Sequence, residues 1–215
     1  MKRNGAVVLA DESNGKVDAK AGVSSAPFTV EVEIEGVAPI LFHRWDCDDV
    51  EAKAQAKKGS REKKTDNVES YVYRCDDGTL GVPATSVHAS LVHAAKSKSD
   101  PRSPRKSAKE LIEAVLLATP PMISFGRDKW DYEDKRRVVI QRQGAVNRVR
   151  PALREGWKLH FNITVLDTSY VDEAFLHELI DYAGKYSGLC DFRPQFGRFT
   201  ITKYEVRGKR NTVEK

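Results

Sequence analysis

Residues 157–165, WKLHFNITV, and residues 199–206, FTITKYEV, decide the fold. Apolar and polar side chains alternate in both stretches, which is the two-residue period of a half-buried strand. Between them, Ser169 and Asp172 are placed to cap a helix. One stripe of that helix is apolar and consists of Val171, Phe175, Leu176, Leu179, Ile180 and Ala183. A strand–helix–strand unit of this kind is compatible with a split βαβ arrangement.

The same alternation occurs closer to the N-terminus. Residues 28–35, FTVEVEIE, alternate until Gly36 interrupts them, and residues 71–73 and 122–125 are also predicted to form strands. Together with the 157–206 unit, this order of strands and helices predicts an α+β fold built on a ferredoxin-like antiparallel sheet.

Two more helices are predicted between these strands. Thr85 and Ser86 are placed to cap the first helix. Ser107 and Glu110 form a capping-box signature for the second. The apolar residues 111–118 that follow are expected to form either a buried helix or a helix that passes into a strand.

Composition along the chain predicts a single domain. Residues 1–26 lack periodicity and are expected to form a flexible N-terminal arm, and residues 208–215 form a polar tail. The domain between them, 27–207, is expected to carry two insertions. One lies near 46–70, where acids and bases crowd together with almost nothing apolar, and the other near 126–155.

The overall composition narrows the class of protein. Thirty-six bases and 31 acids give a net charge of +5, which permits a nucleic-acid partner without requiring one. Mean hydropathy is −0.52, and no apolar run approaches eighteen residues, so a membrane-spanning helix and a membrane partner are not expected. Three widely spaced cysteines without a CxxC pair suit free thiols in a reducing cytoplasm. No metal or other cofactor is expected.

Positive charge is concentrated between residues 135 and 154, where seven bases occur in twenty residues without an acid. Apolar residues at 138–140 and a Gln-Gly pair at 143–144 predict a hairpin that projects from the sheet. The guanidinium group of an arginine can donate two parallel hydrogen bonds to the oxygens of one phosphate. The expected nucleic-acid contacts are Arg136, Arg137, Arg142, Arg148 and Arg150. In the alternative, these arginines pair with the acids of the 46–70 segment on a solvated surface.

Residues 184–199, GKYSGLCDFRPQFGRF, form a second basic segment. Its glycines allow the backbone to approach a polyanion closely, and Phe192 and Phe196 offer rings on which unpaired bases can stack. The expected nucleic-acid contacts here are Lys185, Arg193 and Arg198. The alternative is a tight connection between a helix and a strand, with both phenylalanines buried.

Three segments together resemble the RAMP superfamily of CRISPR-associated proteins. Residues 32–45, VEIEGVAPILFHRW, are similar to the family's opening strand and the loop after it, and residues 80–95, LGVPATSVHASLVHAA, to the entry of its first helix. Residues 188–201, GLCDFRPQFGRFTI, are similar to its glycine-rich loop and closing strand. The loop departs from the family where relatives often carry glycine, at Asp191, Arg193 and Gln195.

The resemblance implies an RRM-type core with helices on one face and a basic, thumb-like hairpin insertion. It is closest to the backbone subunits that polymerise along guide RNA, so the implied function is coating single-stranded guide RNA through phosphate contacts. Copies of this chain, in a filament or multi-subunit ribonucleoprotein, and target nucleic acid are the implied partners. Residues implied to face the RNA are His43, Arg44, Ser86 and His88. A reduced or phage-encoded relative would account for the short chain.

Two alternatives stay open. A metal-independent, guide-processing endoribonuclease of the same superfamily would use His43, beside Arg44, Tyr71 and Tyr73, as its catalytic histidine. A phage protein that coats single-stranded nucleic acid would use the same surface. No HExxH or comparable motif is present, so a binding role without catalysis is the expectation.

Overall fold

A computed structural model describes residues 26–45, 51, 55, 67–140 and 144–207. Nearly all of the predicted N-terminal arm, the polar tail and most of the 46–70 insertion lie outside these residues. The limits assigned to the domain and to its insertions therefore stay predictions.

Twelve strands and six helical segments have both of their ends within the described residues. The strands are β1 (Phe28–Gly36), β2 (Ile40–Leu41), β3 (Tyr73–Arg74), β4 (Leu80–Pro83), β5 (Ser99–Asp100), β6 (Ser103–Ser107), β7 (Leu116–Thr119), β8 (Met122–Ser124), β9 (Tyr132–Ile140), β10 (Gly144–Leu153), β11 (Lys158–Val165) and β12 (Phe199–Arg207). The helical segments are α3 (Ala84–Ala94), α4 (Lys109–Val115), α5 (Glu173–Tyr182), the 3₁₀ turns η1 (Val68–Tyr71) and η2 (Ala95–Ser97), and the π-helical turn η3 (Ala183–Ser187).

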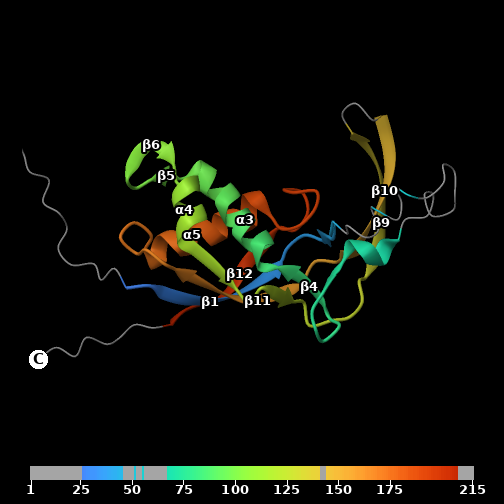
Figure 1. Cartoon of the computed structure of the whole chain (residues 1–215), viewed down its shortest axis with the longest axis horizontal. Helices are drawn as coiled ribbons and strands as arrows, with labels where there is room; N and C mark the ends of the chain where they lie inside the picture. The colour runs from blue at the N-terminus through green and yellow to red at the C-terminus, as the bar shows by residue number, and fades with distance from the viewer. Residues whose placement is uncertain (1–25, 46–50, 52–54, 56–66, 141–143, 208–215) are drawn as a thin grey trace, which may run out of the picture.

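The central sheet has four strands in the order β12-β1-β11-β7, and every neighbouring pair is antiparallel. Along the chain the core therefore runs β1-α3-β7-β11-α5-β12, which is the split βαβ order of a ferredoxin-like fold. The helices α3, α4 and α5 lie on one face of the sheet (Figure 1). The predicted α+β class, ferredoxin-like sheet and one-sided helical layer are confirmed.

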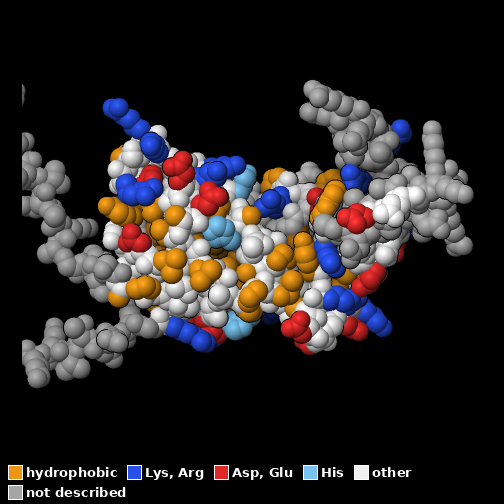
Figure 2. Space-filling model, in the orientation of Figure 1, with side chains coloured by type: hydrophobic (Ala, Val, Ile, Leu, Met, Phe, Trp, Pro, Cys, Tyr) orange, Lys and Arg blue, Asp and Glu red, His pale blue; other side chains and the backbone are white. Residues whose placement is uncertain are grey.

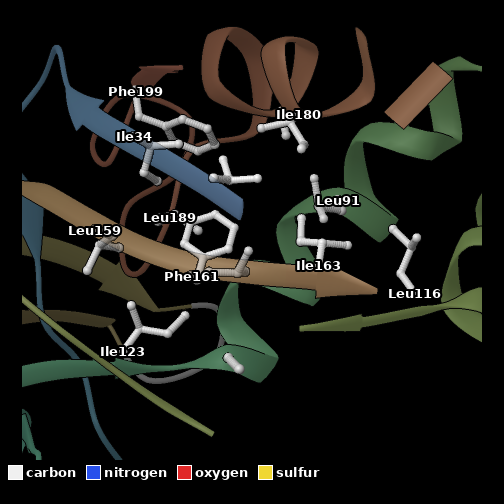
Figure 3. Close-up of a cluster of buried hydrophobic side chains, with 14 of the residues drawn as sticks. Ile34, Leu91, Leu116, Ile123, Leu159, Phe161, Ile163, Ile180, Leu189 and Phe199 are labelled. Atoms are coloured by element: carbon white, nitrogen blue, oxygen red, sulfur yellow. The ribbon is translucent and has the colours of Figure 1, made fainter. Parts of the chain in front are cut away.

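Alternation places the core between this sheet and the helices. In β1 the side chains of Val30, Val32 and Ile34 are fully buried, whereas Glu33 and Glu35 are on the opposite face and pair with Lys158. Strand β11 buries Leu159, Phe161, Ile163 and Val165 in the same way. Leu91 of α3 and Ile180 of α5 cover this apolar face (Figure 3).

The helix ends differ in part from the prediction. Asp172 caps α5 as expected, because its carboxylate accepts the Phe175 N–H at 2.8 Å. The predicted Ser107–Glu110 capping box is wrong, since Ser107 belongs to β6 and Ala108 stands at the N-cap of α4 without a side-chain hydrogen bond. Helix α4 then passes directly into β7, which confirms the second of the two readings of residues 111–118. No helix in the described ranges is long and apolar enough to cross a membrane.

Two hairpins project from this core. Strands β9 and β10 pair antiparallel, and β2 pairs with the far end of β10, so the predicted basic hairpin is present. Its tip, residues 141–143, lies outside the described residues. The second hairpin, β5–β6, follows α3 and η2. The two hairpins stand at opposite ends of the molecule, on the helical side of the sheet (Figure 1).

Candidate nucleic-acid interface

Three segments that are far apart in the sequence meet at the base of the β9–β10 hairpin. They are the loop after β2, strand β10, and the loop between η3 and β12, residues 188–198. Asp191 in that loop joins them, because its Oδ2 lies 3.0 Å from Arg150 Nε and 3.5 Å from His43 Nδ1. We call these three side chains the Asp191 junction.

Arg150 is the buried member of the Asp191 junction. Its side chain is only 2% exposed, its Nη1 donates to the Val149 carbonyl at 2.9 Å, and its guanidinium lies 4.5 Å from the centre of the Tyr71 ring. A buried guanidinium needs a compensating carboxylate, which Asp191 supplies. Arg150, expected from the sequence to contact RNA, is therefore engaged within the protein and holds the hairpin base to the 188–198 loop.

Arg136 makes a second connection between the hairpin and this loop. It is ion-paired with Asp134, and its guanidinium lies 4.8 Å and 4.6 Å from the ring centres of Phe192 and Phe196. The hydrogen bond to Asp134 raises the pKa of Arg136. The two rings expected to stack on bases are thus in contact with a cation of the hairpin.

The 188–198 loop is held in a tight conformation. Gly197 has a φ of +71°, and a Cβ placed there would lie 2.0 Å from the Leu189 carbonyl oxygen, so only glycine fits. The Ser90 hydroxyl of α3 donates to the Gly188 carbonyl at 2.8 Å, and Asp191 N–H donates to the Leu41 carbonyl at 3.1 Å. These bonds fix the Asp191 carboxylate against β10.

A shallow cavity of about 200 Å³ opens beside the junction. His43 and Ser86 line it, so the structure brings together two of the residues implied to face RNA. Burial, and then the positive charge of Arg150, lower the pKa of His43, so its imidazole is neutral near pH 7. Cys190 also lines the cavity, and burial raises the pKa of its thiol to about 12.

The remaining expected contacts lie at or near the surface. Arg137 and Arg193 are exposed and Arg148 is half-buried, and none of the three has an ion pair within the described ranges. Arg198 is exposed and donates to the Pro194 carbonyl at 2.7 Å. Arg142 lies outside the described residues.

Three expected contacts come from the helical side and the β2 loop. Lys185 in η3 is exposed and pairs with Asp181 at 2.7 Å. His88 is half-buried on α3. Arg44 is half-buried, with its guanidinium 5.8 Å from the centre of the Tyr73 ring.

Sequence reasoning missed three residues of this site. In the sequence, Asp191 stands out only as a departure from a glycine pattern. The signal that could have identified it is its position as an acid within a basic loop. Asp134 lies immediately before the acid-free stretch and forms an ion pair with Arg136. Trp45, next to Arg44, is 68% exposed and offers an aromatic face at the surface. The expected partners in the 46–70 segment lie mostly outside the described residues.

Comparison with known proteins gives a likeness in fold. No family model matches the chain, and no curated protein matches it in sequence. The fold, however, is similar to that of a solved structure. It is a chain of the structure described as the type III-B Cmr-beta bound to cognate target RNA, which matches with a TM-score of 0.53 and 13% identity over 84% of this chain. The match covers 61% of that chain, so this protein spans about three fifths of its length.

Proposed function

We propose that this protein is a subunit of a CRISPR-type ribonucleoprotein that binds single-stranded guide RNA through phosphate contacts, in repeated copies. The fold likeness to a chain of the Cmr-beta complex, whose structure includes cognate target RNA, supports the class of assembly. The observation that carries the proposal is the Asp191 junction. It fixes an arginine-rich hairpin beside a basic loop, and both carry arginines that have no ion pair with any described residue.

The arginines divide into two groups by their surroundings. Arg136 and Arg150 are paired with acids and hold the hairpin in place. Arg137, Arg148 and Arg193 have no ion pair in the described residues and supply the phosphate contacts. Contacts to phosphates do not read the bases, so binding is expected to tolerate changes of sequence and to weaken with salt. Trp45 supplies a stacking face for an unpaired base.

The test uses paired charge removals in the full chain. Arg148→Ala/Arg193→Ala removes two proposed contacts, whereas Lys129→Ala/Lys158→Ala removes two exposed cations elsewhere. The slope of log affinity against log salt on an RNA oligomer should fall in steepness by about 1.4 for the first pair, because each phosphate contact on a single strand contributes about 0.7. Equal slopes for the two pairs would overturn the proposal.

Two further measurements define the ligand. The purified protein should carry RNA, which an absorbance ratio detects and sequencing identifies by length. Competition between matched RNA and DNA oligomers separates a guide-RNA subunit from a protein that coats either nucleic acid. An equal preference for both would favour the coating protein.

A guide-processing ribonuclease is a second candidate, favoured by one observation. The His43 imidazole is held neutral and lies 3.5 Å from the Asp191 carboxylate, the pairing that orients a general base. Such an enzyme should cut a repeat hairpin without added metal, and His43→Ala should abolish cutting. An intact hairpin after incubation with the unmodified protein would exclude this role on that substrate.

A further inference from the structure

The β5–β6 hairpin forms a second basic surface that the Asp191 junction does not include. Residues 96–109, KSKSDPRSPRKSAK, hold six bases and one acid. The hairpin lies at the opposite end of the helical layer from β9–β10 (Figure 1), and Lys and Arg side chains gather over it at the upper left of Figure 2.

Half of these bases are already paired with acids. Asp100, which is 3% exposed, forms an ion pair with Arg102 at 2.8 Å. Lys98 pairs with Glu178 at 2.5 Å. Lys109 lies 3.8 Å from Glu113. The other three are exposed and have no ion pair in the described part of the chain: Lys96, Arg105 and Lys106. The Asp100 carboxylate is buried and holds Arg102 by two oxygens, which orders the turn, so the free cations lie on a fixed support rather than on a loose loop.

Tyrosine rings lie next to the paired cations of this surface. The Lys98 Nζ is 5.1 Å from the centre of the Tyr182 ring, and that ring is 4.6 Å from the ring of Tyr186. Tyr186 is 59% exposed. Tyr170 is 45% exposed and lies within electrostatic range of Arg102. The surface therefore carries both free cations and accessible aromatic rings.

From this combination we infer that the β5–β6 surface is a second binding site for single-stranded nucleic acid. Arg105, Lys106 and Lys96 would hold phosphates, and Tyr186 would stack on an unpaired base. An acidic protein surface would be attracted by the same cations, but the exposed tyrosine rings of this surface favour a ligand with unpaired bases. The inference does not depend on the proposed function, because no residue of the Asp191 junction takes part.

Binding measurements on the full chain separate the two kinds of contact. Arg105→Ala/Lys106→Ala should make the salt slope shallower by about 1.4, and Lys129→Ala/Lys158→Ala should leave the slope unchanged. Tyr186→Leu should weaken binding at least about fivefold without altering the slope, because stacking releases no counterions. Each of these side chains is exposed, so the variants are expected to fold.

A 4-thiouridine oligomer provides the position of the contact. After irradiation, cross-linked peptides should include the one that contains Tyr186, and they should still do so in the Arg148→Ala/Arg193→Ala background. Cross-links confined to residues 132–153 and 188–198, with an unchanged slope for the β5–β6 pair, would overturn the inference. It is equally overturned if that pair alters only self-association in sedimentation, since the surface would then bind an acidic face of a second copy.

Discussion

Asp191→Asn tests whether a carboxylate in the 188–198 loop holds the basic hairpin in place. Asparagine has nearly the same shape and can still accept the Phe192 N–H, which donates to Asp191 Oδ1 at 3.0 Å. The substitution therefore removes the charge that faces Arg150 and little else. Arg150, with its side chain 2% exposed, is left as a buried cation without an anion.

The expected cost follows from the geometry. Removing one partner of a fully buried ion pair costs about 3–5 kcal/mol. Asp191 is 27% exposed, and Arg150 keeps the Val149 carbonyl and the Tyr71 ring, so the cost is reduced to about 2 kcal/mol. For a chain of this size that loss corresponds to about 4–8 °C in Tm.

Urea unfolding followed by tryptophan fluorescence measures this cost. The midpoint should fall while the m-value stays constant, because the surface exposed on unfolding does not change. Asp181→Asn is the matched control, since it removes an exposed partner of Lys185 and should cost at most about 0.5 kcal/mol. The double variant Arg150→Gln/Asp191→Asn should cost less than the sum of its single variants. A loss for Asp191→Asn no larger than that of the control would refute the role given to the junction.

Other predictions concern the cavity and the loop. The pKa of His43 is lowered in the folded protein, so unfolding takes up a proton as pH falls through the unfolded pKa of about 6.5; stability should therefore decrease from pH 7 toward pH 5, and His43→Gln should flatten that decrease in urea titrations at each pH. Gly197→Ala should cost at least about 2 kcal/mol more than Gly78→Ala, because both have positive φ but only the first meets a backbone oxygen; equal unfolding midpoints would contradict this. The Cys190 thiol, with its pKa raised to about 12, should react with iodoacetamide at pH 8 on the order of a thousandfold more slowly than an ordinary cysteine. Peptide mapping should find that difference lost in urea.

The central sheet was predictable because its information is local. Residues 28–35 and 157–165 bury alternate apolar side chains, whereas in 199–206 only Phe199 is buried and the other apolar side chains are half-buried against the core. Asp172 caps α5 by a hydrogen bond within the first turn of that helix. The failed capping box at Ser107 shows the limit of such reasoning. Ser107 pairs with Ser99 across a hairpin, and this pairing removed it from the helix that its local sequence favoured.

The Asp191 junction was not predictable, because its members are brought together only by the tertiary fold. Arg150 lies 41 residues from Asp191 along the chain, and nothing in its neighbours marks it as buried. From the sequence alone, all arginines of the hairpin belong to a single class, the expected phosphate contacts. Among the described residues, Arg136 and Arg150 pair with acids, whereas Arg137 and Arg148 do not.

The few acids near the hairpin therefore matter more than its many bases. Five like charges on the two strands repel one another, and a hairpin held only by its backbone would present them in many arrangements. Asp134 and Asp191 each neutralise one arginine and fix its side chain against an aromatic ring. The remaining arginines then stand on an ordered support, and a polyanion that binds them does not have to order the hairpin first. For that reason Asp191→Asn should weaken RNA binding even though it removes a negative charge. A stability loss accompanied by tighter binding would show that the carboxylate opposes RNA rather than organising its site.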